Sequence, residues 1–445
     1  MFMNALVIFY LLSFILLSWF RFRLAVIFFI ILLPAYLVRF NIGPLPSTAL
    51  EFSFGALGLV WILKYARDDF RNIIEFVRFH KLLAIFIALF FVASVIGIFI
   101  SDMWWYSTGQ WRAYFLEPMI LFFILIGRRG KIRPRDLAWA LALSTASISV
   151  YSIIQEFTGW GIATSEWTNE ASRRVTAFFT SPNAVGLYLG PLIPVMAAYV
   201  VVSRARLSNQ SPENKSDEKA WKIYSVVVLA VLSLAALFFS FSQGAWIAVG
   251  VGVAIFLFSI GWVYRKIAIG LVVAGIVAAL IIPSIRTAVL FQDKASQNRI
   301  MLWKYSWEYL KTSPKNFIFG TGIRQFFRKI QKPHYNPAEM ERLIYPHNIF
   351  LNFWTEIGLL GAISFFAMLG YAFYASYAVA RTNKALGGGL ISALAVISIH
   401  GLVDVPYFKN DLAMLFWILM AIIFLLYENQ RQSKAVIGQR AGRKN

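Results

Sequence analysis

The chain has 445 residues, of which 59% are apolar and 17% aromatic, while only 14% carry a charge. This composition excludes an ordinary soluble domain, because no soluble core could bury so many helices that are apolar on every side. The chain contains no cysteine, which excludes disulfides, thiolate metal sites and cysteine nucleophiles.

Apolar stretches of a length suited to a bilayer recur from Asn4 to Tyr427. The first of them lacks a small-residue cleavage site and is followed at once by another, so we interpret it as a membrane anchor and not as a removed signal. The pattern predicts about 12 or 13 transmembrane helices, and hence an all-α polytopic membrane protein.

Lys and Arg in the connections predict the orientation, since short cytoplasmic loops carry an excess of both. The favoured orientation puts most of the 42 basic residues inside. The long connection between Ile285 and His347 then lies outside. We therefore divide the chain into an N-terminal transmembrane bundle, a large outer loop with amphipathic helices, C-terminal transmembrane helices and a basic cytoplasmic tail, over residues 1–283, 284–347, 348–430 and 431–445.

The outer loop departs from the charge rule, because it holds eleven cations against four acids. A solvated surface or attraction to lipid head groups can account for such charges, but the surplus also favours an anionic substrate. Apolar residues at helical spacing predict an amphipathic helix over Asn298–Lys311, whose aromatic stripe we interpret as packing. We further expect a glycine turn at Phe319–Gly322 and a short helix that begins at Pro337 and continues through "PAEMERLI".

Three apolar helices are predicted to start beside polar residues on the outer side. Asn183 lies in the first start, Gln243 in the second and Asn348 in the third. Helix N-termini carry unpaired N–H groups and partial positive charge, so three that converge on one cavity would suit a phosphate group. Arg173 and Arg174 precede the first start and add positive charge there.

His347 stands where the outer loop becomes a long apolar helix. A lone histidine at a helix start most often caps backbone groups, but the residues that follow favour a functional one. Glu356 lies nine residues further on, where an ionisable group needs a partner or a water-filled cavity. Gly358 and Gly361 are three apart, and we expect them on one helix face that permits close helix packing.

The stretch "HNIFLNFWTEIGLLG" has the form His-Asn, nine residues, Gly-x-x-Gly. It resembles the signature of the bacterial O-antigen ligase family and of its superfamily of lipid-linked glycan polymerases and O-oligosaccharyltransferases. Three other stretches agree over about residues 173–427, namely "RRVTAFFTSPNAVGLYLG", "NRIMLWKYSWEYLKTSPKNFIFGTG" and "HGLVDVPYFKNDLAMLFWIL". Together they are more specific to the superfamily than to ligase over polymerase.

The resemblance implies a GT-C-like glycosyltransferase of the bacterial inner membrane with its active site facing the periplasm. Its donor would be a glycan on undecaprenyl diphosphate, which a ligase transfers to a lipid A-core sugar and a polymerase to another lipid-linked unit. Membrane lipids are the remaining expected partners, and no nucleic acid or cofactor is expected. No metal is expected either, because the outer loops show no paired carboxylates that could hold a divalent cation.

The resemblance also carries roles to single positions. His347 resembles the catalytic base, and Arg299 resembles the arginine that holds the diphosphate. Arg173, Arg174 and Arg324 are included in the predicted diphosphate site, with Asn348, Asn183, Gln243, Glu356, Gly358 and Gly361 as supporting residues. The chain departs from the family at Gln243, because an arginine is frequent there. We expect a neutral imidazole at His347, since a helix start and nearby arginines disfavour its protonated form.

A transporter or flippase is the main competing interpretation, since many spans with buried charges also describe a substrate pathway. A carrier would need polar groups at the midplane, whereas the candidate groups gather on one side, and no inverted repeat is evident. A non-catalytic scaffold is the third interpretation, and it leaves the histidine motif unexplained.

Overall fold

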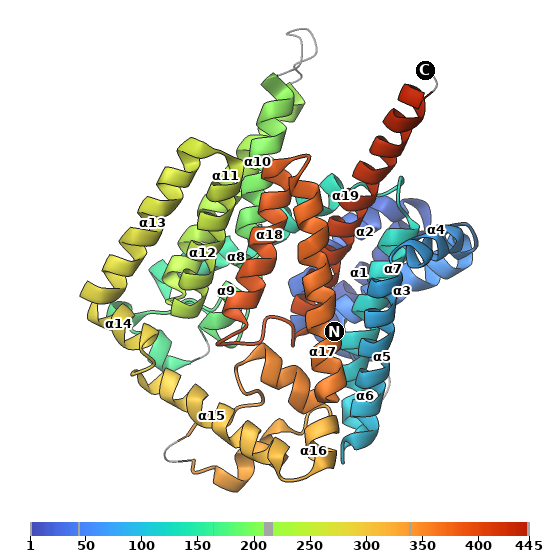
Figure 1. The fold of residues 1–445 in the computed structure, drawn as a ribbon. Helices are drawn as coiled ribbons and strands as arrows, with labels where there is room; N and C mark the ends of the chain where they lie inside the picture. Colours follow the sequence, from blue (N-terminus) through green and yellow to red (C-terminus); the bar gives the residue numbers. More distant parts are fainter. Residues whose placement is uncertain (1, 43–44, 163, 209–216, 338–339, 443–445) are drawn as a thin grey trace.

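The computed structural model describes residues 2–42, 45–162, 164–208, 217–337 and 340–442. Over these residues the protein is almost entirely helical (Figure 1). The described strands are β1 (Arg39–Ile42) and β2 (Leu45–Thr48), which pair in antiparallel register. The fold class predicted from the sequence, an all-α polytopic membrane protein, is confirmed.

The helices follow one another in three groups. Those before the large loop are α1 (Phe2–Phe20), α2 (Phe22–Ile31), α3 (Ala49–Lys64), α4 (Ala66–Phe79), α5 (Lys81–Ile100), α6 (Trp104–Trp111), α7 (Glu117–Gly127), α8 (Pro134–Thr158), α9 (Pro182–Leu189), α10 (Leu192–Ser208), α11 (Asp217–Phe239), α12 (Gln243–Ile260) and α13 (Trp262–Ile281). The loop contains α14 (Pro283–Val289), α15 (Lys294–Lys311) and α16 (Pro314–Phe319), and after it come α17 (Ile349–Ala380), α18 (Lys384–His400) and α19 (Asn410–Gly442). Short 3-10 turns are η1 (Leu33–Leu37), η3 (Ser165–Trp167), η4 (Glu170–Ser172) and η7 (Lys332–His334), and π turns are η2 (Arg112–Leu116) and η6 (Phe327–Gln331).

All the apolar stretches expected to span the membrane are helical, but their lengths differ. Within the described part of the chain, eight helices are long and apolar enough to cross a membrane, or nine if the pair α3 and α4, bent by 96°, forms one span. Shorter apolar helices, among them α2 and α18, supply further expected spans. The count of 12 or 13 therefore includes segments that do not reach full spanning length, because turns interrupt them.

Burial separates the centre of the bundle from its edge. The span of α19 is 83% buried, whereas the span of α13 is only 6% buried. Since both helices are apolar, the difference places α19 at the centre of the helix packing and leaves α13 to face lipid. Accordingly α19 packs against α7 and α17, while α13 packs mainly on α12.

Helices α15 and α16 lie together at one end of the bundle, and the C-terminal end of α10 and the last turns of α19 lie at the other end (Figure 1). Asp293 caps α15 by accepting a hydrogen bond from the Ser296 N–H at 3.0 Å. The amphipathic helix expected over Asn298–Lys311 is thus confirmed, with one further turn at its start.

The prediction of a helix that begins at Pro337 is wrong for the described residues of that segment. Residues 340–344 are irregular, and residues 338–339 lie outside the described part of the chain. The side chain of Gln331 explains the difference, because it donates to the Glu341 carbonyl at 2.7 Å and accepts from the Leu343 N–H at 2.8 Å. These backbone groups are satisfied without a helix.

Gly358 breaks α17 where a continuous helix was expected. Its φ of 78° and ψ of 175° are not helical, so Gly358 and Gly361 do not share one helix face and that expectation is wrong. A Cβ at Gly358 would lie 2.5 Å from the Ile318 carbonyl oxygen of α16. The glycine is therefore needed for its backbone conformation and for the close approach of α16.

We expect Gly358→Ala to destabilise the protein by about 1 to 3 kcal/mol or more, because alanine disfavours this backbone region and would collide with Ile318. The measurement is the Tm of the purified protein in detergent. Gly370→Ala is the matched control, since a Cβ at Gly370 of the same helix meets nothing within 4 Å. An equal Tm for the two variants would contradict this account of the break.

Candidate functional site

His347 directly precedes the cap of α17 and pairs with an aspartate far along the chain. Its Nδ1 lies 3.1 Å from Oδ1 of Asp404, and the two side chains are 24% and 5% exposed. A carboxylate can only accept, so Nδ1 carries a hydrogen, and in the neutral form of the imidazole Nε2 keeps a lone pair. The φ of His347 is 51°, a left-handed conformation uncommon outside glycine and often found at functional sites.

Asp404 is held from several sides. Its Oδ2 accepts from the Asn183 side chain of α9 at 3.1 Å, and its Oδ1 accepts from the Val405 N–H at 2.9 Å. Burial alone would raise the pKa of Asp404, but the charge and hydrogen bond of His347, with His400 and the Val405 N–H, hold that pKa well below its usual range. The carboxylate is therefore ionised at neutral pH and fixes the orientation of the imidazole.

Three helix starts meet at the turn between α18 and α19, which we call the 400–405 turn. Asn183 joins the start of α9 to it through Asp404. The start of α12 packs on it, because a Cβ at Gly244 would lie 3.5 Å from His400 and 2.9 Å from Val403. The start of α17 is tied to it by the Ile349 N–H, which donates to the Gly401 carbonyl at 2.7 Å. Among the described residues, the three helix starts of the prediction therefore surround one turn.

The start of α17 is less open to an anion than expected. The Ile349 N–H is occupied by Gly401, and the Leu351 N–H is occupied by the side chain of Asn348 at 3.0 Å. Asn348 also donates to the Leu402 carbonyl at 3.0 Å. Asn348 thus serves as a helix cap that fastens α17 to the 400–405 turn, and positive charge for an anion must come mainly from side chains.

Arg174 and Arg299 supply that positive charge. Arg174 donates to the carbonyls of Ser240 and Phe241, each at 3.2 Å, directly before α12. Burial lowers the pKa of Arg174, and the charge of Arg299 lowers it further, so the two guanidiniums lie within electrostatic range. Arg299 also acts electrostatically on His400. Two neighbouring cations repel each other, and an anion between them would relieve that repulsion.

Helix α15 connects Arg299 to the histidine. Trp303 lies one turn after Arg299, on the same face of α15, and its Nε1 donates to the Pro346 carbonyl at 2.9 Å. The aromatic stripe of this helix was interpreted as packing, but this contact fastens α15 to the residue before His347. A hydrogen bond therefore links the face of α15 that carries Arg299 to the residue before His347.

Arg173 and Arg174 have different hydrogen-bond partners. Its guanidinium donates to the Glu156 carbonyl, and to the Thr168 carbonyl at 3.2 and 3.3 Å. Among the described contacts, none joins Arg173 to Arg299 or Asp404. The geometry thus favours Arg174 over Arg173 for the diphosphate, while Arg173 stabilises the loop that precedes α9.

Arg324 belongs to a second polar cluster, around Glu356. The fully buried carboxylate of Glu356 accepts from the Arg324 N–H at 3.3 Å and from the Gln110 side chain at 3.2 Å. The guanidinium of Arg324 lies over the Tyr106 ring, 5.7 Å from its centroid. Glu356 has the partners that its depth requires. No described contact brings Arg324 to Arg174 or Arg299.

Comparison with protein families gives one match. Residues 228–366 match the model of the family described as O-antigen ligase. This match supports a relationship to the O-antigen ligase family over this segment. Comparison with curated proteins gave no match. The match supports the ligase and polymerase superfamily, whose members are glycosyltransferase-like enzymes, and the apolar helices indicate an integral membrane protein.

The O-antigen ligase segment contains only part of the site. Arg299 and His347 lie inside residues 228–366, as does Gln243 at the first position of α12. Arg174, Asn183 and the 400–405 turn lie outside the matched residues. The assembled site therefore joins the matched segment to helices before and after it.

Sequence reasoning missed Asp404, His400 and Lys409. Lys409 is half-buried, its Nζ lies 5.2 Å from the Phe179 ring centroid, and burial lowers its pKa while the charges of Asp411 and Asp404 oppose that shift. All three missed residues lie in the stretch "HGLVDVPYFKND", whose resemblance to the O-antigen ligase family was noted without assigning roles. The signal was a cluster of ionisable residues where an apolar helix was expected to continue.

Proposed function

We propose that the chain is an O-antigen ligase that transfers a glycan en bloc from undecaprenyl diphosphate to a sugar hydroxyl of a lipid A core. The observation that carries the proposal is the His347–Asp404 pair, together with the neighbouring cations Arg174 and Arg299, of which Arg299 acts electrostatically on His400 in the 400–405 turn. A base for an acceptor hydroxyl and positive charge for a diphosphate are the two groups that such a transfer needs.

His347 would act as the base. The carboxylate of Asp404 orients the imidazole through Nδ1 and stabilises the positive charge that forms on it. Nε2 would take the proton of the acceptor hydroxyl as its oxygen bonds to the anomeric carbon of the donor sugar. The bond from that carbon to the diphosphate oxygen breaks, and its electron pair leaves with the diphosphate. No metal is part of the proposal, and the proton ends on His347.

Arg299 and Arg174 would hold the leaving diphosphate. Guanidinium groups are always charged and bind phosphate oxygens through two parallel hydrogen bonds. Negative charge grows on the leaving group as the glycosidic bond breaks, so fixed cations stabilise the transition state more than the ground state. Gln243 would contribute a neutral hydrogen-bonding group where many relatives place a cation.

A polymerase of the same superfamily is the alternative, and product analysis separates the two. Purified protein would be incubated with glycan on undecaprenyl diphosphate and with lipid A core. Glycan on the lipid A core supports a ligase, whereas longer chains on the lipid carrier support a polymerase. Translocation without any transfer would support the transporter interpretation.

The active site would face the periplasm, on the charge-based orientation. We expect Lys315→Cys, an exposed position in α16, to react with an impermeant maleimide in intact spheroplasts, since the chain has no other cysteine. Arg381→Cys, exposed after α17, is the control and should react only after lysis. The reverse pattern would overturn the proposed orientation.

A further inference from the structure

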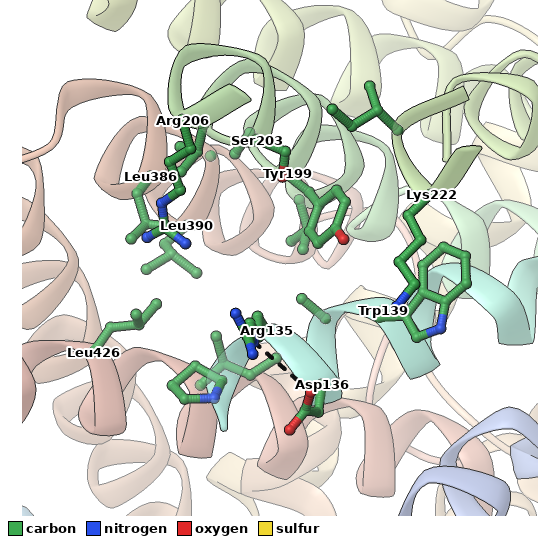
Figure 2. A pocket seen from close by; sticks show the side chains of 18 of the residues that line it. Arg135, Asp136, Trp139, Tyr199, Ser203, Arg206, Lys222, Leu386, Leu390 and Leu426 are labelled. Carbon is green, nitrogen blue, oxygen red and sulfur yellow. Dashed lines mark ion pairs between the residues drawn. The ribbon is translucent and has the colours of Figure 1, made fainter. Parts of the chain in front are cut away.

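A cavity of about 490 Å³ lies at the end of the bundle opposite the candidate site. The start of α8, the end of α10, the start of α11 and parts of α18 and α19 surround it (Figure 2). Helix α8 runs from the cavity toward the candidate site. Its first residues line the cavity, whereas Gln155, near its other end, donates to the Ala177 carbonyl, three residues after Arg174. The cavity therefore belongs to neither the proposed catalytic site nor the Glu356 cluster.

The inner wall of the cavity is apolar. Val195, Leu390 and Ile422 line it and are almost completely buried. Leu386 and Leu426 extend this apolar surface along α18 and α19 (Figure 2). Such a wall offers no hydrogen-bonding partner to a small hydrophilic anion, but it suits the hydrocarbon chain of an amphiphile.

The rim of the cavity is basic. Arg23, Arg135, Arg206 and Lys222 line it, and Asp136 is the one acidic residue among the described lining residues. Arg23 holds the Asp136 carboxylate at 2.7 Å, whereas the Arg135 guanidinium is 4.0 Å away. Arg135 and Arg206 are exposed to solvent. The positive charge of the rim therefore exceeds what its carboxylate neutralises.

Two aromatic side chains also line the cavity. Trp139 and Tyr199 both line the cavity, and their rings stack with centroids 6.5 Å apart (Figure 2). Amphipathic aromatic rings of this kind gather at the level of lipid head groups. The cavity thus combines cationic, aromatic and apolar side chains, the three kinds that suit the phosphate, the glycerol region and the acyl chain of a phospholipid.

We propose that this cavity binds an anionic membrane phospholipid, with the phosphate at Arg135 and Arg206 and an acyl chain along Leu390 and Leu426. Basic pockets between transmembrane helices on the cytoplasmic side are suited to anionic head groups, and the charge-based orientation places this end of the protein there. A free phosphate would leave the apolar wall unused, and a zwitterionic lipid would bring a cation of its own to the basic rim. The proposal does not depend on the proposed glycan transfer.

The test is to count bound lipids on the purified full chain by native mass spectrometry, during titration with dioleoylphosphatidylglycerol in a nonionic detergent. We expect one lipid to bind tightly, and the double variant R135Q/R206Q to bind it at least about tenfold more weakly, because two cations near the phosphate are removed. Dioleoylphosphatidylcholine should bind more weakly to the wild type and respond little to the substitutions.

Three controls decide the outcome. Arg67→Gln removes an exposed cation of α4 that does not line the cavity, and it should leave binding unchanged. Val202→Trp keeps every cation but fills the cavity, and it should weaken lipid binding while its Tm reports whether it folds. Competition by inorganic phosphate as strong as that by the lipid would point to a soluble anion and overturn the proposal. Equal binding to wild type and R135Q/R206Q, or an equal loss in Arg67→Gln, would overturn it as well.

Discussion

His347→Ala is expected to reduce glycan transfer by at least about a hundredfold while donor binding largely survives, because the substitution removes the proposed base and leaves both arginines in place. Transfer and donor binding should be measured in the same preparation. Since the pKa of Asp404 is held well below its usual range, this carboxylate stays ionised from mildly acidic pH upward. A loss of wild-type transfer on mild acidification would therefore not be caused by protonation of Asp404.

His334→Ala is the matched control for that experiment. His334 lies in the same loop and stacks on Tyr305 with ring centroids 3.9 Å apart, in none of the contacts of the candidate site. We expect it to keep transfer. Activity retained in His347→Ala would remove the histidine from catalysis, and a parallel loss of donor binding would make it a substrate ligand.

Arg299→Ala is expected to lower transfer by two to three orders of magnitude, as when one preorganised donor to a developing charge is removed. Arg299→Lys keeps the positive charge but loses the planar pair of donors, so we expect only partial recovery. The measurement is the kcat and KM of transfer with the lipid-linked donor. A role at the leaving diphosphate predicts a fall in kcat, beyond any rise in KM.

Lys304→Gln is the control for charge on the same helix. Lys304 is exposed and lies 3.9 Å from Glu308, five residues after Arg299 and on another face of α15. Its replacement should change transfer little. If Arg299→Ala kept full activity, or if Lys304→Gln lost as much, the arginine would have no specific place in the site.

Much of the fold followed from apolar periodicity, because an element that is apolar on all sides has few alternatives to a membrane helix. Element ends were less predictable. Helix α18 stops at His400, although the sequence remains largely apolar up to Val405, and a turn that contains Asp404 begins there. Apolar residues flank that turn and bury it, so the hydropathy of the segment alone did not reveal its end.

Contacts between residues that are far apart in the sequence could not be predicted from one sequence either. His347, Arg299 and Asn183 were identified one at a time, from their local surroundings. Asp404, the common partner of His347 and Asn183, lies 57 residues after His347 and 221 after Asn183. No local periodicity encodes such a contact. The break of α17 at Gly358 was not predicted for a similar reason, because the need for a glycine there depends on the close approach of α16, which is distant in the sequence.

The 400–405 turn limits how this protein could exchange parts with its relatives. A transplant of residues 228–366 would carry the histidine and the loop arginine but leave behind the aspartate, the asparagine and Arg174. In such a chimera, the transplanted histidine would face the corresponding turn of the recipient protein and would lack the Asp404 of this chain. A functional transplant would therefore need more than the family segment. It would have to include the residues from the loop before α9 to the start of α19.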